Sequence, residues 1–356
     1  MVLPRPVVQF CSRCRRYVCR IECFLVLCLL IAAGLYYRRW RTGFVTVPPV
    51  KESNGEPVST WSVSKENVAV HAVRGPRPTM EDRFDFYMDI SKPRNHHPIS
   101  YYGIFDGHGG VASVEYVETH LINNLRSRIE TGYDGFNLNW TQVLTEEMLK
   151  IDREIAEIAP PNEDVSGSTA VVAILHDRKL VIGNIGDSRA VLGTPTGAAI
   201  PLTRDHKAND ELELAMLKQR GGWISFFGVW RVVGVLAMSR ALGDHYLKTP
   251  KPYVIALPDV FELDLDQIFA SNPDQSPGEG DPFLILASDG LWDVVTNKEA
   301  VDLVRERLHV DGFGAAELTE LALSRMSQDN ISVMIVLLNL SRPGFTVDSV
   351  SGRRRA

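Results

Sequence analysis

Residues 101–110 read Tyr-Tyr-Gly-Ile-Phe-Asp-Gly-His-Gly-Gly, and the rest of the chain is organised around this stretch. An apolar run typical of a buried strand ends abruptly at Asp106, and two glycines open the helical pattern that follows. Asp106 supplies negative charge, Gly107 lets its own carbonyl approach a cation, and His108 can carry a proton. Because Asp-Gly is also a common turn, a cation site requires support from further motifs.

The same arrangement, a carboxylate in a turn of small residues beside a β-rich run, occurs at Asp187, Asp289 and Asp329, and Glu81-Asp82 precedes another strand. The strands of a sheet can bring such ends together. Several carboxylates share a dry cleft only if cations offset their repulsion. Oxygen ligands without cysteine or a histidine pair favour Mg²⁺ or Mn²⁺ over zinc.

Two such ions about 4 Å apart suit attack on a phosphorus atom, because they lower the pKa of a shared water and place it in line. Arg77 is the candidate to bind the phosphate oxygens, and His108 is the candidate to protonate the leaving oxygen. The residues therefore predict metal-dependent phosphoryl hydrolysis.

Composition excludes several other classes of protein. The chain has 356 residues, of which 45% are hydrophobic and 23% charged, as in a globular protein. Residues 1–41 hold eight arginines and one acid, so the rest is more acidic than the net charge of −6, which argues against nucleic acid as a partner. All five cysteines lie within the first 28 residues, so the body has no disulfide and no cysteine nucleophile.

The basic N-terminus, residues 1–20, leads into an apolar segment at 21–37 that is interrupted only by Glu22. Arg20 precedes this segment and three arginines at 38, 39 and 41 follow it, so we expect a single transmembrane anchor with snorkelling arginines. A cleaved signal peptide and a mitochondrial presequence are the alternatives. The nearby cysteines are candidate palmitoylation sites: Cys11, Cys14, Cys19, Cys23 and Cys28.

A tether is expected over 42–65, a single α+β domain over 67–340 and a C-terminal tail over 341–356. Strands follow strands and helices come in pairs, which favours an antiparallel core flanked by paired helices. The aromatic hairpin at 223–230 is expected to pack as core, with a mobile flap near the substrate as the alternative. The predicted strands are 68–73, 83–88, 100–105, 169–175, 180–185, 283–287 and 331–338; the predicted helices are 109–130, 139–159, 209–220, 296–308 and 314–326.

The body resembles the metal-dependent protein serine/threonine phosphatases of type 2C over some 270 residues, because eight of that family's motifs occur in the family's order. With the apolar N-terminal segment, the chain looks most like the membrane-anchored, epsilon-type branch. The motifs are Arg77-x-x-Met80-Glu81-Asp82-Arg83, Phe105-Asp106-Gly107-His108-Gly109-Gly110, Ser168-Thr169-Ala170, Gly186-Asp187-Ser188-Arg189-Ala190, Asp205-His206-Lys207, Ala237-Met238-Ser239-Arg240-Ala241-Leu242-Gly243-Asp244, Ala287-Ser288-Asp289-Gly290-Leu291-Trp292-Asp293 and Asp329-Asn330-Ile331-Ser332-Val333.

The resemblance implies a fold and a metal centre. The fold is an α-β-β-α sandwich, in which two antiparallel β-sheets pack face to face between paired helices. In the metal centre, Asp106 bridges two ions and the carbonyl of Gly107 binds one of them. Asp289 and Asp329 hold the other ion.

Further roles are implied for the remaining motif residues. Glu81 and Asp82 act through water, and Asp187 with Asp293 serves a third, weaker ion. Simpler interpretations stay open: Asp187 as a turn cap, Asp293 as an acid at a helix N-terminus, and His108 as a structural histidine. We expect His206 and Lys207 to be loop residues rather than catalytic ones, and Arg240 to pair with a local carboxylate rather than touch the substrate.

The resemblance implies hydrolysis of phosphoserine and phosphothreonine on proteins, with kinases or receptors as plausible substrates, by a monomeric catalytic domain. The anchor would place it on the endoplasmic reticulum or another endomembrane with the domain in the cytosol; mitochondria are the second choice. The alternative function is a catalytically inactive relative that binds or scaffolds phosphoproteins. A phosphodiesterase acting on nucleic acid is disfavoured by the acidic body.

Overall fold

The computed structural model describes residues 60–91, 98–131, 138–158, 164–266 and 281–338. The predictions for 1–20, 21–37 and 341–356 concern residues outside these ranges. No helix among the described residues is long and apolar enough to cross a membrane.

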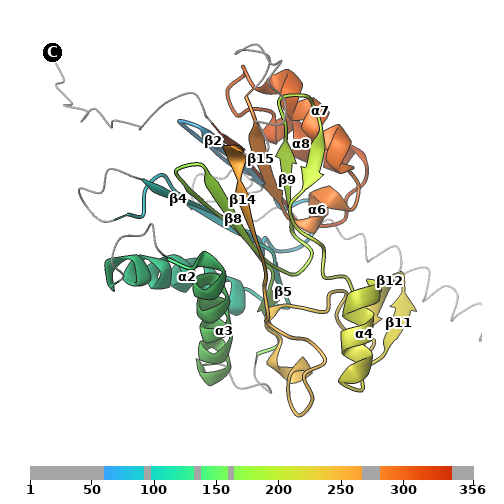
Figure 1. The fold of residues 1–356 in the computed structure, drawn as a ribbon. Helices are drawn as coiled ribbons and strands as arrows, with labels where there is room; N and C mark the ends of the chain where they lie inside the picture. The colour runs from blue at the N-terminus through green and yellow to red at the C-terminus, as the bar shows by residue number, and fades with distance from the viewer. Residues whose placement is uncertain (1–59, 92–97, 132–137, 159–163, 267–280, 339–356) are drawn as a thin grey trace, which may run out of the picture. The chain divides into compact units, whose positions relative to one another are not determined.

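Two antiparallel sheets form the centre of the fold (Figure 1). The six-stranded sheet has the order β1 (Thr60–Lys65), β2 (Val68–Val73), β16 (Ile331–Leu337), β15 (Phe283–Ala287), β9 (Arg189–Gly193) and β10 (Ala199–Pro201). The five-stranded sheet has the order β14 (Asp259–Asp264), β8 (Lys179–Ile185), β7 (Ala170–His176), β4 (Ile99–Phe105) and β3 (Arg83–Tyr87).

The two sheets pack against each other, and helices cover their outer faces. Successive side chains of a strand point to opposite faces, so Tyr102 and Ile104 of β4 contribute to the core between the sheets. Tyr101 and Phe105 of the same strand contribute to the core under the helices. Both faces are buried, which explains why the central strands read as continuous apolar runs.

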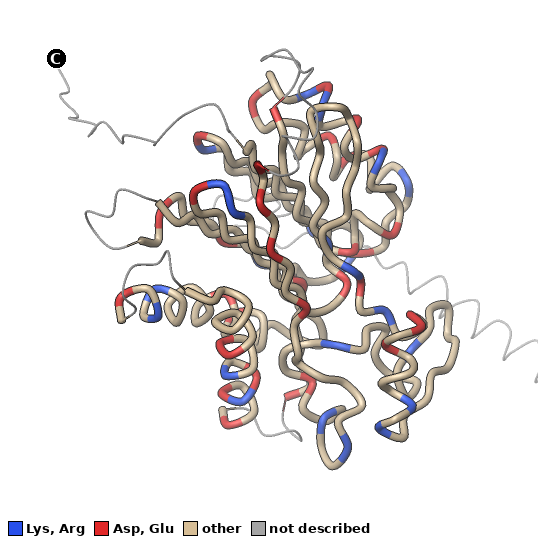
Figure 2. Tube along the Cα trace, viewed as in Figure 1, with Lys and Arg blue, Asp and Glu red and all other residues tan. Residues whose placement is uncertain are grey.

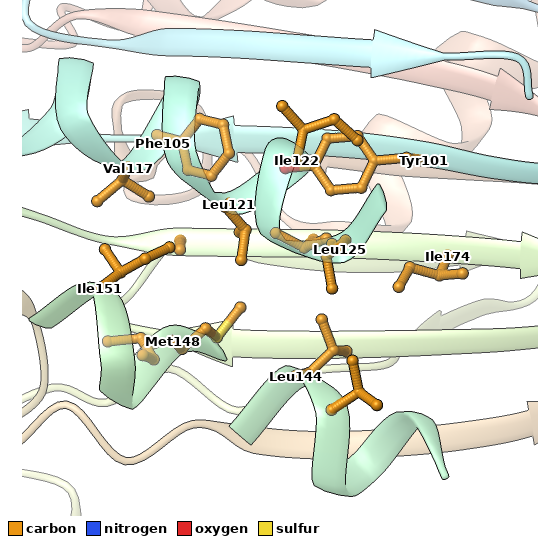
Figure 3. Packing of buried hydrophobic residues seen from close by; sticks show 14 of the residues in the cluster. Tyr101, Phe105, Val117, Leu121, Ile122, Leu125, Leu144, Met148, Ile151 and Ile174 are labelled. Carbon is orange, nitrogen blue, oxygen red and sulfur yellow. The ribbon is translucent and has the colours of Figure 1, made fainter. Parts of the chain in front are cut away.

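Helices α2 (Ala112–Thr131) and α3 (Trp140–Ile158) cover the five-stranded sheet. Figure 3 shows Leu121 of α2 and Met148 of α3 among the side chains that fill the space between these helices and the strands. The six-stranded sheet is covered by α6 (Asp289–Trp292), α7 (Asn297–Arg307) and α8 (Ala315–Ser324). The expected antiparallel sheets and helices are confirmed.

Four smaller elements complete the described fold. A three-stranded sheet consists of β13 (Leu242–Gly243), β6 (Gly167–Ser168) and β5 (Gly107–His108). The 3₁₀ helix η2 (His245–Leu247) follows β13. Helix α4 (Glu211–Gln219) lies before the hairpin of β11 (Ile224–Phe227) and β12 (Val229–Val232).

The expectation that the aromatic hairpin packs as core is wrong. Phe227 is 67% exposed, and Trp223, Phe226 and Trp230 are also exposed. Phe226 and Trp230 contact each other edge to face instead of entering a core. The alternation of apolar residues predicted the hairpin correctly, but periodicity does not reveal whether anything covers the apolar face.

The predicted tether is also wrong in its last six residues, because β1 (Thr60–Lys65) pairs with β2 along its whole length. The strand lies at the edge of the sheet and most of its side chains are exposed, so its apolar pattern is weak. Since β1 belongs to the six-stranded sheet, the domain begins earlier than the predicted boundary near residue 67. The rest of the tether lies outside the described residues.

Candidate active site

The acidic turns identified in the sequence lie at the ends of central strands. Asp106 follows β4, and its neighbour strand β3 runs antiparallel and begins just after Asp82. In the other sheet, Asp289 follows β15, and Asp329 precedes the antiparallel β16. Ser288 Oγ donates a hydrogen bond of 2.8 Å to Asp82 Oδ2, which joins the turns of the two sheets.

The backbone around Asp106 is held on both sides by Thr169. The Asp106 amide donates to Thr169 Oγ1 at 3.0 Å, and the Thr169 amide donates to the Asp106 carbonyl at 2.9 Å. Thr169 Oγ1 also bonds to Ser188 Oγ at 2.8 Å, beside Asp187. These contacts fix the turns that carry Asp106 and Asp187 relative to each other.

Gly107 lies where no side chain fits. A Cβ atom there would come within 2.6 Å of the Glu81 carbonyl oxygen and 2.8 Å of a Val114 methyl carbon. The Glu81 amide in turn donates to Asn330 Oδ1 at 2.7 Å. The close approach therefore connects the turn after β4 to the strand start at Glu81 and to the Asp329-Asn330 turn.

The carboxylates at these turns destabilise one another's charged forms. Burial, followed by repulsion from Asp82 and Asp289, raises the pKa of Asp106 well above its usual range. Burial, followed by repulsion from Asp187, does the same for the pKa of Asp289. Burial raises the pKa of Asp82 to about 6 and also raises that of Asp187. The cluster is therefore electrostatically short of positive charge.

Arg77 supplies part of that charge to Asp329. Its guanidinium nitrogen lies 2.5 Å from Asp329 Oδ2, and its Nε donates to the Gln328 carbonyl at 3.0 Å. Burial nevertheless raises the pKa of Asp329, with Arg77 opposing the shift. The Arg77 side chain is half exposed, so its remaining N–H groups are accessible to an incoming anion.

Lys207 lies between Asp187 and Asp293, the pair predicted to hold a third ion. Its Nζ is 2.7 Å from Asp293 Oδ1 and 3.7 Å from Asp187 Oδ2. Burial lowers the pKa of Lys207, but the two carboxylates outweigh it and the net shift is upward. The expectation of a merely structural loop residue misses this contact, because the partners of Lys207 lie far away in the sequence.

His108 pairs with Asp244, for which the sequence predicted no role. The His108 Nε2 to Asp244 Oδ2 distance is 2.7 Å, and Asp244 is fully buried. Burial by itself lowers the pKa of His108, but Asp244, with help from Asp187 and Glu81, raises it overall. A charged imidazolium that could release a proton is therefore favoured beside the carboxylate cluster.

The residues of the cluster fit a hard divalent cation. The acidic side chains of the cluster supply oxygen ligands, and one oxygen each of Asp82 and Asp187 is buried without a hydrogen-bond partner among the described residues. Within the described ranges, no three His, Cys, Asp or Glu side chains already form a complete metal cage. Mg²⁺ needs no such cage, because it keeps several waters and takes only one or two carboxylates.

A second group of polar residues near the site is structural. Arg240 forms a buried ion pair with Glu213 at 2.6 Å and reaches Asp259 at 2.7 Å, as expected for a pairing role. His206 is buried: its Nδ1 accepts from the Gly186 amide at 3.0 Å, and its Nε2 contacts Asp259 at 3.1 Å. This network supports the turn that precedes Asp187.

Comparisons with known proteins agree with this architecture. The family model described as protein phosphatase 2C matches residues 66–331. The chain is 42% identical over 280 residues to protein phosphatase 1L of Bos taurus, which covers 78% of this chain and 74% of the relative. It is 41% identical over 263 residues to the probable protein phosphatase 2C 52 of Oryza sativa, covering 74% of this chain but only 48% of the rice protein.

A solved serine-threonine phosphatase 2C from Toxoplasma gondii superposes with a TM-score of 0.64 at 23% identity, covering 78% of this chain and 98% of that one. This likeness supports the fold. The chain belongs to the protein phosphatase 2C family of serine/threonine phosphatases, whose members depend on Mg²⁺ or Mn²⁺.

Proposed function

We propose that this chain hydrolyses phosphoserine and phosphothreonine on proteins and requires Mg²⁺ or Mn²⁺. The observation that carries the proposal is the buried carboxylate cluster, in which the pKa values of Asp106 and Asp289 are raised by burial and mutual repulsion. An arginine with free donors and a histidine stand beside the cluster. Membership of the phosphatase 2C family supports the same reaction.

In this proposal, two ions are held by Asp106, the Gly107 carbonyl, Asp289 and Asp329. Glu81 and Asp82 act through water. When bound, the ions supply Lewis-acid charge that makes a water nucleophilic at neutral pH. The protein's contribution is a rigid, dry cluster, which the contacts of Thr169 and Ser288 provide.

Arg77 and His108 act on the substrate itself. Arg77 binds the phosphate oxygens with the guanidinium N–H groups that face away from Asp329. His108 donates a proton to the serine or threonine oxygen as the bond to phosphorus breaks. A third ion between Asp187 and Asp293 would have to displace the ammonium of Lys207, so we propose that two ions suffice for turnover.

The test is hydrolysis of a phosphothreonine peptide by the full-length chain with Mn²⁺ or Mg²⁺, and with EDTA. We expect turnover to vanish with EDTA and to fall more than about 100-fold in Asp106→Asn and Asp289→Asn, since loss of mere outer-shell support costs roughly 10- to 100-fold. Asp302→Asn on α7, whose side chain pairs with Lys298 at the surface, is the matched control. A folded wild type that binds the peptide without hydrolysing it would instead identify a scaffold.

We also propose that the chain acts as a monomer on phosphoproteins at a membrane, such as kinases or receptors, with the catalytic domain in the cytosol. The support is the apolar segment 21–37 between arginines, which resembles the anchor of the epsilon-type branch. Figure 2 shows Lys and Arg scattered among Asp and Glu along the described trace, which does not favour nucleic acid as a partner.

The proposed membrane location and orientation are tested by fractionating cells that express the full chain and by adding protease to intact vesicles. Retention in carbonate-washed endomembranes, with the domain digested from outside, supports the proposal. Release into the soluble fraction, a shortened mature chain or recovery in mitochondria contradicts it.

A further inference from the structure

The small sheet β13-β6-β5 brings together two residues that are 136 positions apart. In β6, Gly167 pairs with His108 of β5 on one side and with Gly243 of β13 on the other. Asp244 follows Gly243 directly, so its carboxylate meets the His108 ring across Gly167. The main consequence of this sheet is therefore the contact between His108 and Asp244.

Gly167 is required for that contact. A Cβ atom at this position would overlap both Asp244 Oδ2 and His108 Nε2. The φ of Gly167 is not positive, so its backbone does not demand glycine. Glycine is needed because any Cβ would occupy the space where the Asp244 and His108 side chains meet.

Asp244 is held in an unfavourable conformation. Its φ of 50° and ψ of 38° lie in the left-handed region, which is uncommon for residues other than glycine. Its amide donates to the Ser166 carbonyl at 3.0 Å, and the preceding Gly243 amide donates to Asp152 Oδ1 at 2.9 Å. A buried charge with a strained backbone at an active site suggests a functional reason for both.

The contact also determines which nitrogen of His108 remains available. Nε2 is engaged with Asp244, whereas Nδ1 is buried without a hydrogen-bond partner among the described residues. A carboxylate accepts but does not donate, so it keeps a proton on Nε2. Any proton that the ring delivers must then come from Nδ1.

We propose that Asp244 is a positioning residue for His108, which fixes the ring so that Nδ1 delivers the proton to the leaving oxygen. This inference rests on the proposed function. As water oxygen bonds to phosphorus, the bond from phosphorus to the serine or threonine oxygen breaks, and that oxygen takes the Nδ1 proton. The attacking water releases one proton to solvent. Nε2 keeps its proton and its hydrogen bond to Asp244, and His108 regains its lost proton from solvent.

The test compares two substrates with different needs for an acid. A phosphothreonine peptide releases a poor leaving group that must be protonated, whereas para-nitrophenyl phosphate releases a stabilised phenolate. In the full-length chain, Asp244→Asn should lower kcat on the peptide roughly 10- to 100-fold and on the nitrophenyl ester by less than about threefold. Asparagine tolerates the left-handed backbone, so the fold is expected to persist.

Two further variants separate positioning from structural support. Gly167→Ala should give the same substrate-selective loss, because its Cβ would force Asp244 and His108 apart although neither side chain is itself replaced. Asp152→Asn is the matched control: it supports Gly243 and Lys248 but does not touch His108, so any loss should be equal on both substrates.

A double mutant completes the test. If Asp244 acts through His108, adding Asp244→Asn to His108→Gln should lower peptide turnover by less than about twofold more. Equal losses on both substrates, or losses that multiply in the double mutant, would overturn the inference. Failure of the proposed function is distinguishable, because the wild type itself would then hydrolyse neither substrate.

Discussion

Two histidine–aspartate pairs lie close to the carboxylate turns, and they differ in which partner is buried. In the His108–Asp244 pair the carboxylate is fully buried, and the Nδ1 of the partly exposed ring has no hydrogen-bond partner in the described part of the chain. In the His206–Asp259 pair the ring is buried with both nitrogens bonded, and the carboxylate is half exposed. A ring with one free nitrogen can exchange a proton, whereas a ring with two bonded nitrogens can only hold parts together.

The two aspartates, Asp259 and Asp244, also differ in the charged partners that they bind. Asp259 shares its charge between His206 and Arg240, and Arg240 is itself bonded to Glu213. Among the described residues, the ion pair of Asp244 is with His108, and the phenol of Tyr246 also hydrogen-bonds to it. The comparison teaches that the role of a histidine depends more on whether a ring nitrogen lacks a hydrogen-bond partner than on how deeply the ring is buried.

The largest effect is expected from His108→Gln. Glutamine keeps an N–H for Asp244 but has no acidic proton to donate, so kcat on a phosphothreonine peptide should fall roughly 100- to 10,000-fold. The unfolding free energy should change by less than about 1 kcal/mol, as measured by urea denaturation. Turnover near the wild-type level would show that this pair is as structural as the other.

Glu213→Gln tests the network behind the second pair. Removing the buried partner leaves Arg240 paired with the half-exposed Asp259, so the unfolding free energy should fall by about 3 kcal/mol at pH 7. Burial raises the pKa of Glu213, but hydrogen bonds from Arg240 and Ser239 outweigh it and lower the pKa overall. Because the folded pKa lies below the unfolded value, the stabilisation is complete above about pH 4.5 and is lost as the pH falls further.

The measurement is urea denaturation of wild type and variant at pH 7 and near pH 4. The difference between them should shrink at the lower pH as Glu213 becomes protonated. A difference that stays constant with pH would mean that Arg240 and Glu213 are held by packing rather than by charge.

His206→Gln should lower the unfolding free energy by about 2 kcal/mol. The buried ring makes two hydrogen bonds, and the glutamine side chain can keep at most one of them. Turnover per folded molecule should fall by less than about threefold. A much larger loss of kcat at unchanged stability would move this histidine into the same class as His108.

The smallest effect is expected from Asp259→Asn. The side chain is half exposed, and Arg240 retains Glu213, so the loss should be about 1 kcal/mol in thermal or urea denaturation. A loss as large as that of Glu213→Gln would show that Asp259 anchors the network after all.

Local patterns predicted most of the fold. The strand at Phe283–Ala287 was predicted with its observed limits, and the ends of α3 differ by one residue. The apolar periodicity of strands and helices involves residues close together in the sequence, so it predicts these elements without knowledge of tertiary contacts. Edge strand β1 and the exposed hairpin were misjudged, because the covering of an apolar face depends on distant segments.

The sequence by itself determined the acidic turns at strand ends, the likeness to the phosphatase family and the absence of cysteine chemistry in the body. Only the tertiary structure decided which groups meet: Asp244 against His108, and Lys207 between Asp187 and Asp293. The physical reason is the antiparallel strand order, which joins residues far apart in the chain. No local period records which strand end will face another, so these contacts emerge only when both sheets have formed.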